Sequence, residues 1–300
     1  VSIQLDHAGT LSNTISSIAA GGAPGIDANI PTISSIILAD TALKAGETSL
    51  VTITFSEAVT AFSNVDIPTI DNGILSAVSS GDGGTTWTAT FSPTADIEDT
   101  TNVITILKTG LTDIAGNAGT GTSSSANYEI DTLRPTVSGV SSSTTNDYYN
   151  AGDVIAITIT FSQAVTVTGT PQITLETGDT DRAVSYSSGS GTTVLTFSYT
   201  VQAGDTSADL DYVATSSLAL NSGTIRDAAI NDATLTLATP GAANSLGANK
   251  ALVIDTTNPT VNAGSDHIGN VEYTQDGTVS DTNGILTYAW TKISGSGVVS

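Results

Sequence analysis

Carboxylates are the side chains of this sequence whose types and spacing could do chemistry. The chain carries 29 acidic and 7 basic residues, which gives a formal net charge of −22. Calcium takes roughly six to eight oxygen ligands from carboxylates, amide carbonyls and water, so turns rich in Asp, Glu and Asn are candidate sites. The candidate metal ligands are Asp27, Glu57, Asp96, Glu98, Asp99, Asp113, Asn117, Asp131, Asp205, Asp209, Asp211, Asp227, Asn231, Asp232 and Asp255. Structural Ca²⁺ is therefore the candidate cofactor.

Other chemistry finds little support in the sequence. There is no cysteine, and the two histidines, His7 and His267, stand alone near the ends of the chain. No phosphate-binding loop or zinc motif is present, and the abundant Ser and Thr residues lack a base to activate them. We therefore expect no enzymatic activity. The acidic balance excludes nucleic acid as a plausible partner, and without an apolar run of about 18 residues we expect no membrane insertion.

A phrase of the form Ile-Asp-x-x-x-Pro-Thr divides the chain. It begins at Ile26, Ile130 and Ile254, so the intervals are 104 and 124 residues, each the length of a small domain. Its Ile should be the last inward residue of a closing strand, and its Pro should begin the next domain because it lacks an N–H. The short phrase also predicts a semi-rigid linker. The predicted organisation is a domain tail at 1–27, a domain at 28–131, a longer domain at 132–257 and the start of another at 258–300.

Short strands predict an all-β fold. Residues 51–55 alternate with Val51, Ile53 and Phe55 inward, and residues 86–91 alternate with Trp87, Ala89 and Phe91 inward. The inward phase of Trp87 favours core packing over a role in stacking on sugars. Strong turn signals lie between these strands, and no stretch has a sustained helical period. This pattern indicates a β-sandwich.

The second domain repeats the first. Residues 157–166 correspond to 51–60, and residues 227–232 correspond to 113–118, in the same order and at similar offsets. Repetition at a domain-sized period indicates an array of modules. The second domain is about 20 residues longer, and much of the excess lies near residues 231–250, for which we expect a longer final hairpin.

Several of these segments resemble known modules. The sequences VTITFSEAVT at 51–60, TDIAGNAGTG at 112–121 and YEIDTLRPTV at 128–137 resemble the bacterial Ig-like repeats of giant surface adhesins. The resemblance covers about residues 26–260, and residues 261–300 resemble the start of a PKD-type Ig-like domain. It implies tandem sandwiches arranged end to end as an elongated array, in an extracellular protein of the bacterial cell surface. Because the chain contains no Met and starts in mid-pattern, we take it as part of a longer protein.

Ig-like topology predicts which acidic loops meet. The loop after the second strand and the loop before the last strand lie at the pole of the incoming linker. In the first domain this places Glu57, Asp113 and Asn117 near Asp27, and in the second it places Gln163, Asp227, Asn231 and Asp232 near Asp131. The opposite poles carry the acids Asp96, Glu98 and Asp99 in the first domain and Asp147, Asp153, Asp205, Asp209 and Asp211 in the second.

The junctions at Asp131 and Asp255 would then be lined by acids of both neighbouring domains. Bound Ca²⁺ would relieve the repulsion between these carboxylates. The alternative is that they are ordinary turn residues, because Asp and Asn favour turns for local hydrogen bonding. The second domain has Gln163 at the position that corresponds to Glu57, which weakens the case for an identical site there.

Two classes of function compete. The first is a non-catalytic stalk of a large exported adhesin or filament, which gives reach and stiffness for cell-surface adhesion. The second is a set of accessory or glycan-binding modules of an extracellular polysaccharide-degrading enzyme. Repetition favours the stalk, because near-equivalent modules build length more readily than a catalytic site. The adhesion ligand, on a cell surface or substratum, would bind domains outside this chain, and self-association along a filament is a candidate interaction.

Overall fold

The computed structural model describes residues 27–264 and 277–281. The chain divides into two compact units: the first holds most residues up to 130, and the second holds residues from 131 onward together with segments 44–46 and 95–98. The expected tail at 1–27, apart from Asp27, lies outside the described residues. So do both histidines and most of the PKD-like segment, including Trp290. The domain limits deduced from the linker phrase stay predictions.

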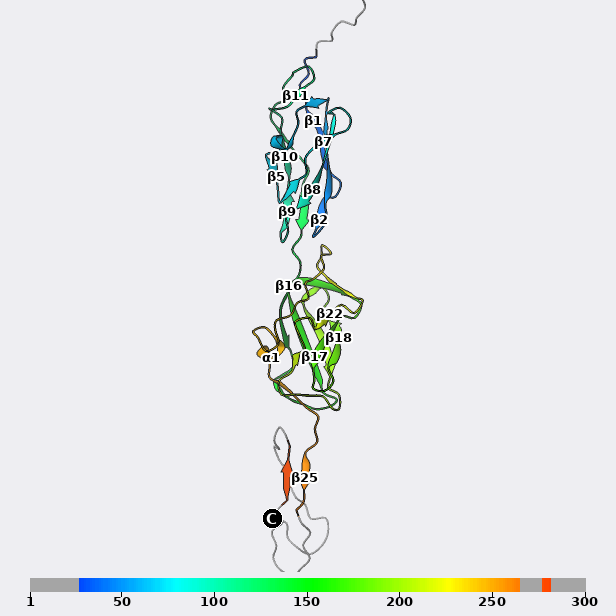
Figure 1. Ribbon diagram of the computed structural model, residues 1–300, viewed down its shortest axis with the longest axis vertical. Helices are drawn as coiled ribbons and strands as arrows, with labels where there is room; N and C mark the ends of the chain where they lie inside the picture. Colours follow the sequence, from blue (N-terminus) through cyan, green and yellow to red (C-terminus); the bar gives the residue numbers. More distant parts are fainter. Residues whose placement is uncertain (1–26, 265–276, 282–300) are drawn as a thin grey trace, which may run out of the picture. The chain divides into compact units, whose positions relative to one another are not determined.

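One layer of the first unit is an antiparallel sheet in the order β1-β3-β8-β6, with β7 paired to β8. Figure 1 shows β1 and β7 on one side of this unit and β5 and β10 on the other. The strands of this layer are β1 (Ile33–Leu38), β3 (Ser49–Phe55), β6 (Gly73–Leu75), β7 (Ser79–Ser80) and β8 (Thr86–Pro93).

The other layer of the first unit consists of three short groups of strands. β10 (Ile104–Leu107) lies between β12 (Thr122–Ser124) and β5 (Thr69–Ile70), and β13 (Tyr128–Asp131) lies between β2 (Ala42–Lys44) and β9 (Glu98–Asn102). β4 (Val59–Thr60) pairs with β11 (Thr112–Asp113), and a 3-10 turn spans Asn64–Asp66. The two layers form the sandwich that the strand pattern predicts.

The core of the first unit lies between these layers. Val51, Ile53 and Phe55 are at most 2% exposed, which confirms their predicted inward phase. Trp87 also faces inward: its ring meets the edge of Phe62 at a centroid distance of 5.4 Å, and its indole N–H donates to the carbonyl oxygen of Gly84 at 2.9 Å. Burial of these apolar groups is the main stabilising force of the fold.

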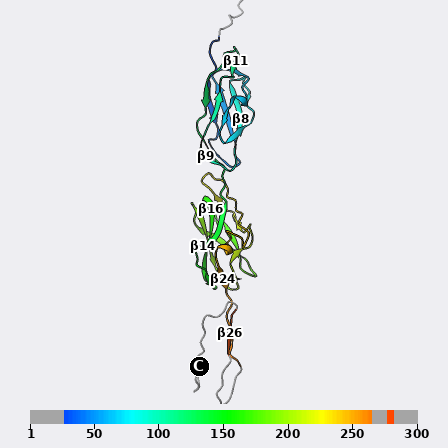
Figure 2. The same ribbon diagram turned by 90° about the vertical axis from the view of Figure 1, so that its left-hand side faces the viewer.

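The second unit is built on a longer sheet. Its strand order is β14-β16-β19-β18-β17-β21, with β22 on β17 and β23 on β16, while β24 lies between β15 and β20. Figure 2 shows β14, β16 and β24 within this unit. The strands are β14 (Val137–Ser142), β15 (Asp147–Tyr149), β16 (Val154–Thr168), β17 (Gln172–Glu176), β18 (Arg182–Ser188), β19 (Thr192–Thr200), β20 (Thr206–Ser207), β21 (Asp211–Tyr212), β22 (Leu218–Ala219), β23 (Thr224–Arg226) and β24 (Leu252–Asp255).

The prediction of a long final hairpin at 231–250 is wrong. Between β23 and β24 the described chain forms no extended strand, only isolated bridges and the helical turn α1 (Leu246–Asn249). This segment lies along the edge of β14: the Val140 N–H donates to the Asn244 carbonyl at 2.9 Å, and the Asn249 side chain donates to the Val140 carbonyl at 2.8 Å. Its residues are mostly small, Leu237 and Leu246 are its buried members of the core, and the segment covers an edge strand where a further hairpin was expected.

The two units share local details that the sequence repeat predicts. The first strand of each carries a bulge after its first paired residue, between Ile33 and Ser35 in one and between Val137 and Gly139 in the other. The closing isoleucines Ile130 and Ile254 are both buried, as expected for the last inward residue of a closing strand. Beyond β24, only β25 (Thr260–Asn262) and β26 (Thr278–Ser280) are described, as an antiparallel pair.

Candidate metal centre

A tight turn between Asp113 and Asn117 forms the floor of the candidate site in the first unit. The Asn117 backbone N–H donates to one carboxylate oxygen of Asp113 at 2.8 Å, and the Asn117 side-chain amide donates to the other at 2.7 Å. Gly116 closes the turn with a φ of +94°, a conformation that suits glycine because it has no Cβ. The Asp113 carboxylate is therefore held in one fixed orientation.

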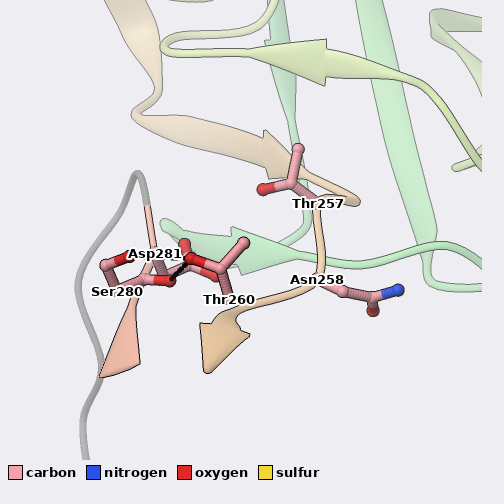
Figure 3. A pocket seen from close by; sticks show the side chains of 5 residues that line it. All are labelled: Thr257, Asn258, Thr260, Ser280 and Asp281. Atoms are coloured by element: carbon pink, nitrogen blue, oxygen red, sulfur yellow. Dashed lines mark hydrogen bonds between the residues drawn. The ribbon is translucent and has the colours of Figure 1, made fainter. Parts of the chain in front are cut away.

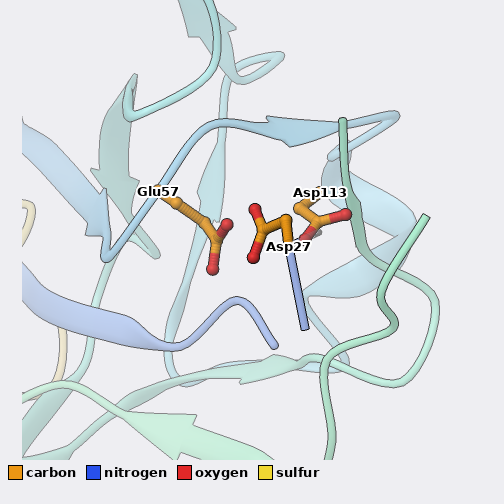
Figure 4. Close-up of side chains that lie close together, drawn as sticks. All are labelled: Asp27, Glu57 and Asp113. Atoms are coloured by element: carbon orange, nitrogen blue, oxygen red, sulfur yellow. The ribbon is translucent and has the colours of Figure 1, made fainter. Parts of the chain in front are cut away.

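The incoming linker joins this turn. The Asn117 side-chain amide also donates to the backbone carbonyl of Asp27 at 3.1 Å, and the Asp27 carboxylate accepts from the Asn29 backbone N–H at 3.0 Å. Glu57 lies in the short loop between β3 and β4. One carboxylate oxygen from each of Asp27, Glu57 and Asp113 lies within 4.8 Å of the others, and Figure 4 shows Asp27 between the other two side chains.

Electrostatics at this pole favour a cation. Desolvation raises the pKa of Glu57, and the charges of Asp27 and Asp113 raise it further. Burial also opposes ionisation of Asp113, but hydrogen bonds from Asn117, Gly116 and Ala115 outweigh it and lower the pKa of that carboxyl. A fixed anion beside a carboxylate that resists ionisation is an arrangement that a positive ion would stabilise.

The donor set of the first unit fits calcium. Oxygen ligands at about 2.3–2.6 Å from one ion are separated from each other by at most about 5 Å. The three carboxylates meet this limit, because their nearest oxygens lie within 4.8 Å of one another. Each supplies one oxygen to the group, and water can complete the shell. Asp27 is exposed and Asp113 is buried, so the site opens to solvent on the linker side.

The second unit repeats this turn with one exchange. Asp227 accepts from the Asn231 backbone N–H at 2.7 Å and from its side-chain amide at 2.9 Å, and the same amide donates to the Asp131 carbonyl at 2.9 Å. At the position of Glu57, however, stands Gln163. Its amide donates to the Asp227 carboxylate at 3.2 Å and to the Leu133 carbonyl at 2.8 Å. Desolvation raises the pKa of Asp131, and the charge of Asp227 adds to this effect.

The comparison with protein families agrees with the fold of the first unit. Residues 27–130 match the bacterial Ig-like domain family. No curated protein matches the chain. The matched region, the bacterial Ig-like domain, begins at Asp27 and ends within β13 at Ile130, and it contains the whole carboxylate cluster. Domains of this family are common in extracellular surface proteins. Within the described residues, no helix has the length and apolar character needed to cross a membrane.

The acids at the far pole of the bacterial Ig-like domain have local partners. Asp99 accepts from the backbone and side chain of Thr101 and from the Asn72 side chain, and these hydrogen bonds lower its pKa. Asp96 is exposed and adopts a φ of +57° in its turn, and Glu98 is exposed at the start of β9. Among the described residues these three do not form a close carboxylate group.

Asp205 has a different role from the predicted one. It is 1% exposed, and its carboxylate accepts from Arg182 at 2.8 Å, from the Tyr199 hydroxyl at 2.7 Å and from the Gln202 backbone at 2.9 Å. Burial opposes its ionisation, but the Arg182 and Tyr199 hydrogen bonds lower its pKa overall. The carboxylate therefore has three hydrogen-bond partners within the unit, whereas its backbone carbonyl accepts from Thr256 of the outgoing linker. The signal in the sequence was Arg182, a rare base at the start of a strand.

The remaining acids of the second unit are also divided among separate partners. Asp232 pairs with Arg226 at 2.6 Å, and Asp211 accepts from the Gly241 backbone at 2.8 Å. Desolvation raises the pKa of Asp209, and the charge of Asp211 raises it further. Asp255 accepts from the backbone of Thr257 at 2.9 Å, as Asp131 does from Leu133 and Asp27 from Asn29. The predicted junction sites shared by neighbouring domains stay predictions.

A shallow pocket lies near the end of the described chain. Thr257, Asn258, Thr260, Ser280 and Asp281 line it (Figure 3). The hydroxyls of Thr260 and Ser280 are 2.8 Å apart across β25 and β26. This lining offers hydroxyl, amide and carboxylate groups for hydrogen bonding.

Proposed function

We propose that this chain is a non-catalytic stalk segment of an exported bacterial cell-surface adhesin or filament, and that its modules give reach and stiffness to binding domains outside the chain. The observation that supports this proposal is the attachment of linker residues to the units they enter and leave. A linker that is hydrogen-bonded to a folded domain has fewer accessible directions than a free peptide. The match of residues 27–130 to a bacterial Ig-like domain supports the extracellular setting.

The incoming linkers are attached in the same way in both units. The Asn117 side-chain amide donates to the Asp27 carbonyl at 3.1 Å, and the Asn231 side-chain amide donates to the Asp131 carbonyl at 2.9 Å. In the second unit Gln163 adds a bond to the Leu133 carbonyl. The asparagines that shape the turns therefore also fix where each linker meets its module.

The linker that leaves the second unit is attached as well. The Thr256 hydroxyl donates to the Asp205 carbonyl at 2.9 Å and accepts from the Gly204 backbone N–H at 2.9 Å. The corresponding Thr132 accepts from the Ile97 backbone at 3.1 Å. These threonines follow the Asp of the linker phrase, and each is hydrogen-bonded to backbone groups of a loop in the second unit.

Calcium is the second part of the proposal. An ion bound by Asp27, Glu57 and Asp113 would tie the linker to the loops after β3 and around β11. When the free Ca²⁺ concentration is about 100 times the dissociation constant, binding stabilises the folded state by about 2.7 kcal/mol. For a domain of this size that corresponds to a rise in melting temperature of about 10 °C.

Thermal melts test the calcium part. We expect the first unit of the wild-type chain to melt at a higher temperature in CaCl₂ than in EGTA, and Glu57→Gln to remove most of this difference. Glu129→Gln, an exposed carboxylate on β13, is the matched control and should retain it. An unchanged melting temperature in CaCl₂ would refute the calcium proposal.

Small-angle X-ray scattering tests the stalk. The wild-type chain should give a distance distribution with a well-defined maximum dimension. Insertion of four Gly-Ser residues after Leu133 should broaden that distribution and shorten the mean dimension, because it introduces a flexible coil into the linker. If the insertion leaves the scattering profile unchanged, the native linker is already flexible and the stalk proposal fails.

A further inference from the structure

The two units differ at the edge of their larger sheets. β1 in the first unit and β14 in the second are equivalent edge strands, each at the end of its sheet beside β3 or β16. On the open side of β14, the Val140 N–H donates to the Asn244 carbonyl at 2.9 Å, and the Asn249 side chain donates to the Val140 carbonyl at 2.8 Å. The edge of the second unit is thus covered by backbone and amide groups of its own chain.

The same edge of the first unit has no such cover. The register of β1 on β3 matches that of β14 on β16, bulge included, and places Ile36 where the second unit has Val140. The N–H and carbonyl groups of alternate residues in an edge strand point away from the sheet, so those of Ile36 and Leu38 face outward. Within residues 27–264, no hydrogen bond from another segment reaches this side of β1. The segment before the closing strand pairs with β10 instead, as β12.

The side chains of β1 also suit an exposed interaction surface. Ile37 alternates with buried Ile36 and Leu38 and is 56% exposed on the outer face of the sheet, whereas the covered strand β14 has Ser141 at this position. Charged residues and proline commonly protect an open edge, and residues 33–38 include neither. The bulge lies at the start of β1, so Ile36, Ile37 and Leu38 form a regular stretch to which another strand can add.

Charge indicates which partner fits this edge. The chain has a formal net charge of −22, so two copies repel each other over most of their surface. Residues 28–39, which include β1, carry no charged side chain, and neither do residues 48–56, which include β3. Two acidic chains can therefore approach at this edge with little repulsion. The edge also matches itself, because antiparallel pairing of a strand with its own copy aligns donors with acceptors.

We propose that two copies of this chain associate side by side through β1 of the first unit, so that their sheets join into one antiparallel sheet. A two-fold axis at Ile37 places the two Ile37 side chains against each other. It also lets the N–H and carbonyl of Ile36 exchange hydrogen bonds with those of Leu38 in the other copy. The second unit takes no part, because its edge is covered. This pairing goes beyond the stalk role and depends neither on that role nor on calcium.

Cysteine cross-linking of the full chain tests the geometry, because the chain contains no cysteine of its own. In Ile37→Cys the two thiols would belong to a non-hydrogen-bonded antiparallel pair, whose Cα atoms lie about 4.5 Å apart, within the reach of a disulfide. Leu50→Cys, at a residue that is 51% exposed on β3, is the control away from the edge. Ser141→Cys is the control at the equivalent position of the covered edge.

Each variant is oxidised at high protein concentration, since pairing along so short a strand is weak. Association holds the two thiols together, so we expect Ile37→Cys to form the covalent dimer roughly tenfold faster than either control. Equal rates for the three variants overturn the proposal, because cross-linking is then collisional.

Sedimentation velocity of variants without cysteine tests the association itself. The dimer fraction of the wild-type chain should rise with salt, which screens the repulsion between the acidic chains. Ile37→Glu should abolish the dimer, because it places two like charges opposite each other, and Leu50→Glu should retain it. A wild-type chain that stays monomeric at every salt concentration contradicts the proposal. So does an Ile36 amide that is protected from hydrogen exchange in the dilute monomer, because another segment of the same chain then covers the edge.

Discussion

Replacement of Asp205 by Asn should be the most destabilising conservative change of a charged residue in the second unit. Asp205 is 1% exposed and its partner Arg182 is 24% exposed, with 2.7 Å between the guanidinium and the carboxylate. The carboxylate also holds the Tyr199 hydroxyl and the Gln202 backbone. Its backbone carbonyl accepts from Thr256, so the same loop anchors the outgoing linker.

The loss of folding free energy in Asp205→Asn follows from the groups that the substitution leaves without a charged partner. Removal of one partner of a buried ion pair costs about 3–5 kcal/mol, because the other charge stays uncompensated. Asn keeps one oxygen that can accept from Tyr199 or Gln202, and partly exposed Arg182 can recover some hydration. We therefore expect a cost near the lower limit, about 3 kcal/mol, which corresponds to an opening constant raised on the order of 100-fold.

An exposed ion pair in the same unit provides the control. Asp232 pairs with Arg226 at 2.6 Å, but the two side chains are 60% and 40% exposed. Pairs of this kind contribute about 0–1 kcal/mol. Asp232→Asn makes the same chemical change at a similar distance, so the comparison isolates the effect of burial.

Hydrogen exchange read peptide by peptide, together with urea unfolding, measures both variants. Peptides from β18, β19 and β24 should exchange faster in Asp205→Asn, and peptides from the first unit serve as an internal reference. Exchange in Asp232→Asn should remain close to that of the wild-type chain. If Asp205→Asn costs no more than Asp232→Asn, burial does not set the value of this pair and the reasoning is wrong.

Three further predictions concern pH, backbone strain and a buried hydroxyl. Because the folded state lowers the pKa of Asp205, the stability that comes from its pair with Arg182 should be present at neutral pH and be lost as the pH falls below about 4. Urea unfolding midpoints across about pH 3–7 measure this loss of stability, and the Asp205→Asn variant should not show it. Ile230 adopts a φ of +71° at the position where the first unit has Gly116. In urea unfolding, Ile230→Gly should therefore be neutral or stabilising by up to about 1 kcal/mol, and Gly116→Ile should be destabilising by about 1–2 kcal/mol. The opposite order would refute the argument that the backbone is strained at this position. The hydroxyl of Tyr128 is buried and donates to the Asp71 carbonyl at 2.6 Å, so Tyr128→Phe should lower the stability of the first unit by about 1 kcal/mol in thermal melts, with no effect on the second.

The comparison of the two turns illustrates what a repeat in the sequence can predict. The correspondence of residues 113–118 with 227–232 located the Asp and Asn of each turn, and the hydrogen bonds of these residues agree to within a few tenths of an ångström. The same alignment matched Gly116 with Ile230 without indicating that both need a positive φ. The sequence repeat indicates which residues of the two turns are equivalent. The backbone conformation of each residue depends on how the turn closes through its hydrogen bonds.

By itself the sequence determined the all-β fold, the inward phase of Val51, Ile53 and Phe55, and the closing isoleucines. These features follow from side-chain alternation, which acts between residues near one another in the chain. The tertiary structure decided the features that depend on distant residues. It enclosed Asp205 with Arg182 and laid residues 231–250 along the edge of β14 where a hairpin was expected, whereas the approach of Asp27 to Glu57 and Asp113 was already expected from the Ig-like topology. The physical reason is that the surroundings of a carboxylate or of a sheet edge are set by how the layers pack, which no short window of sequence contains.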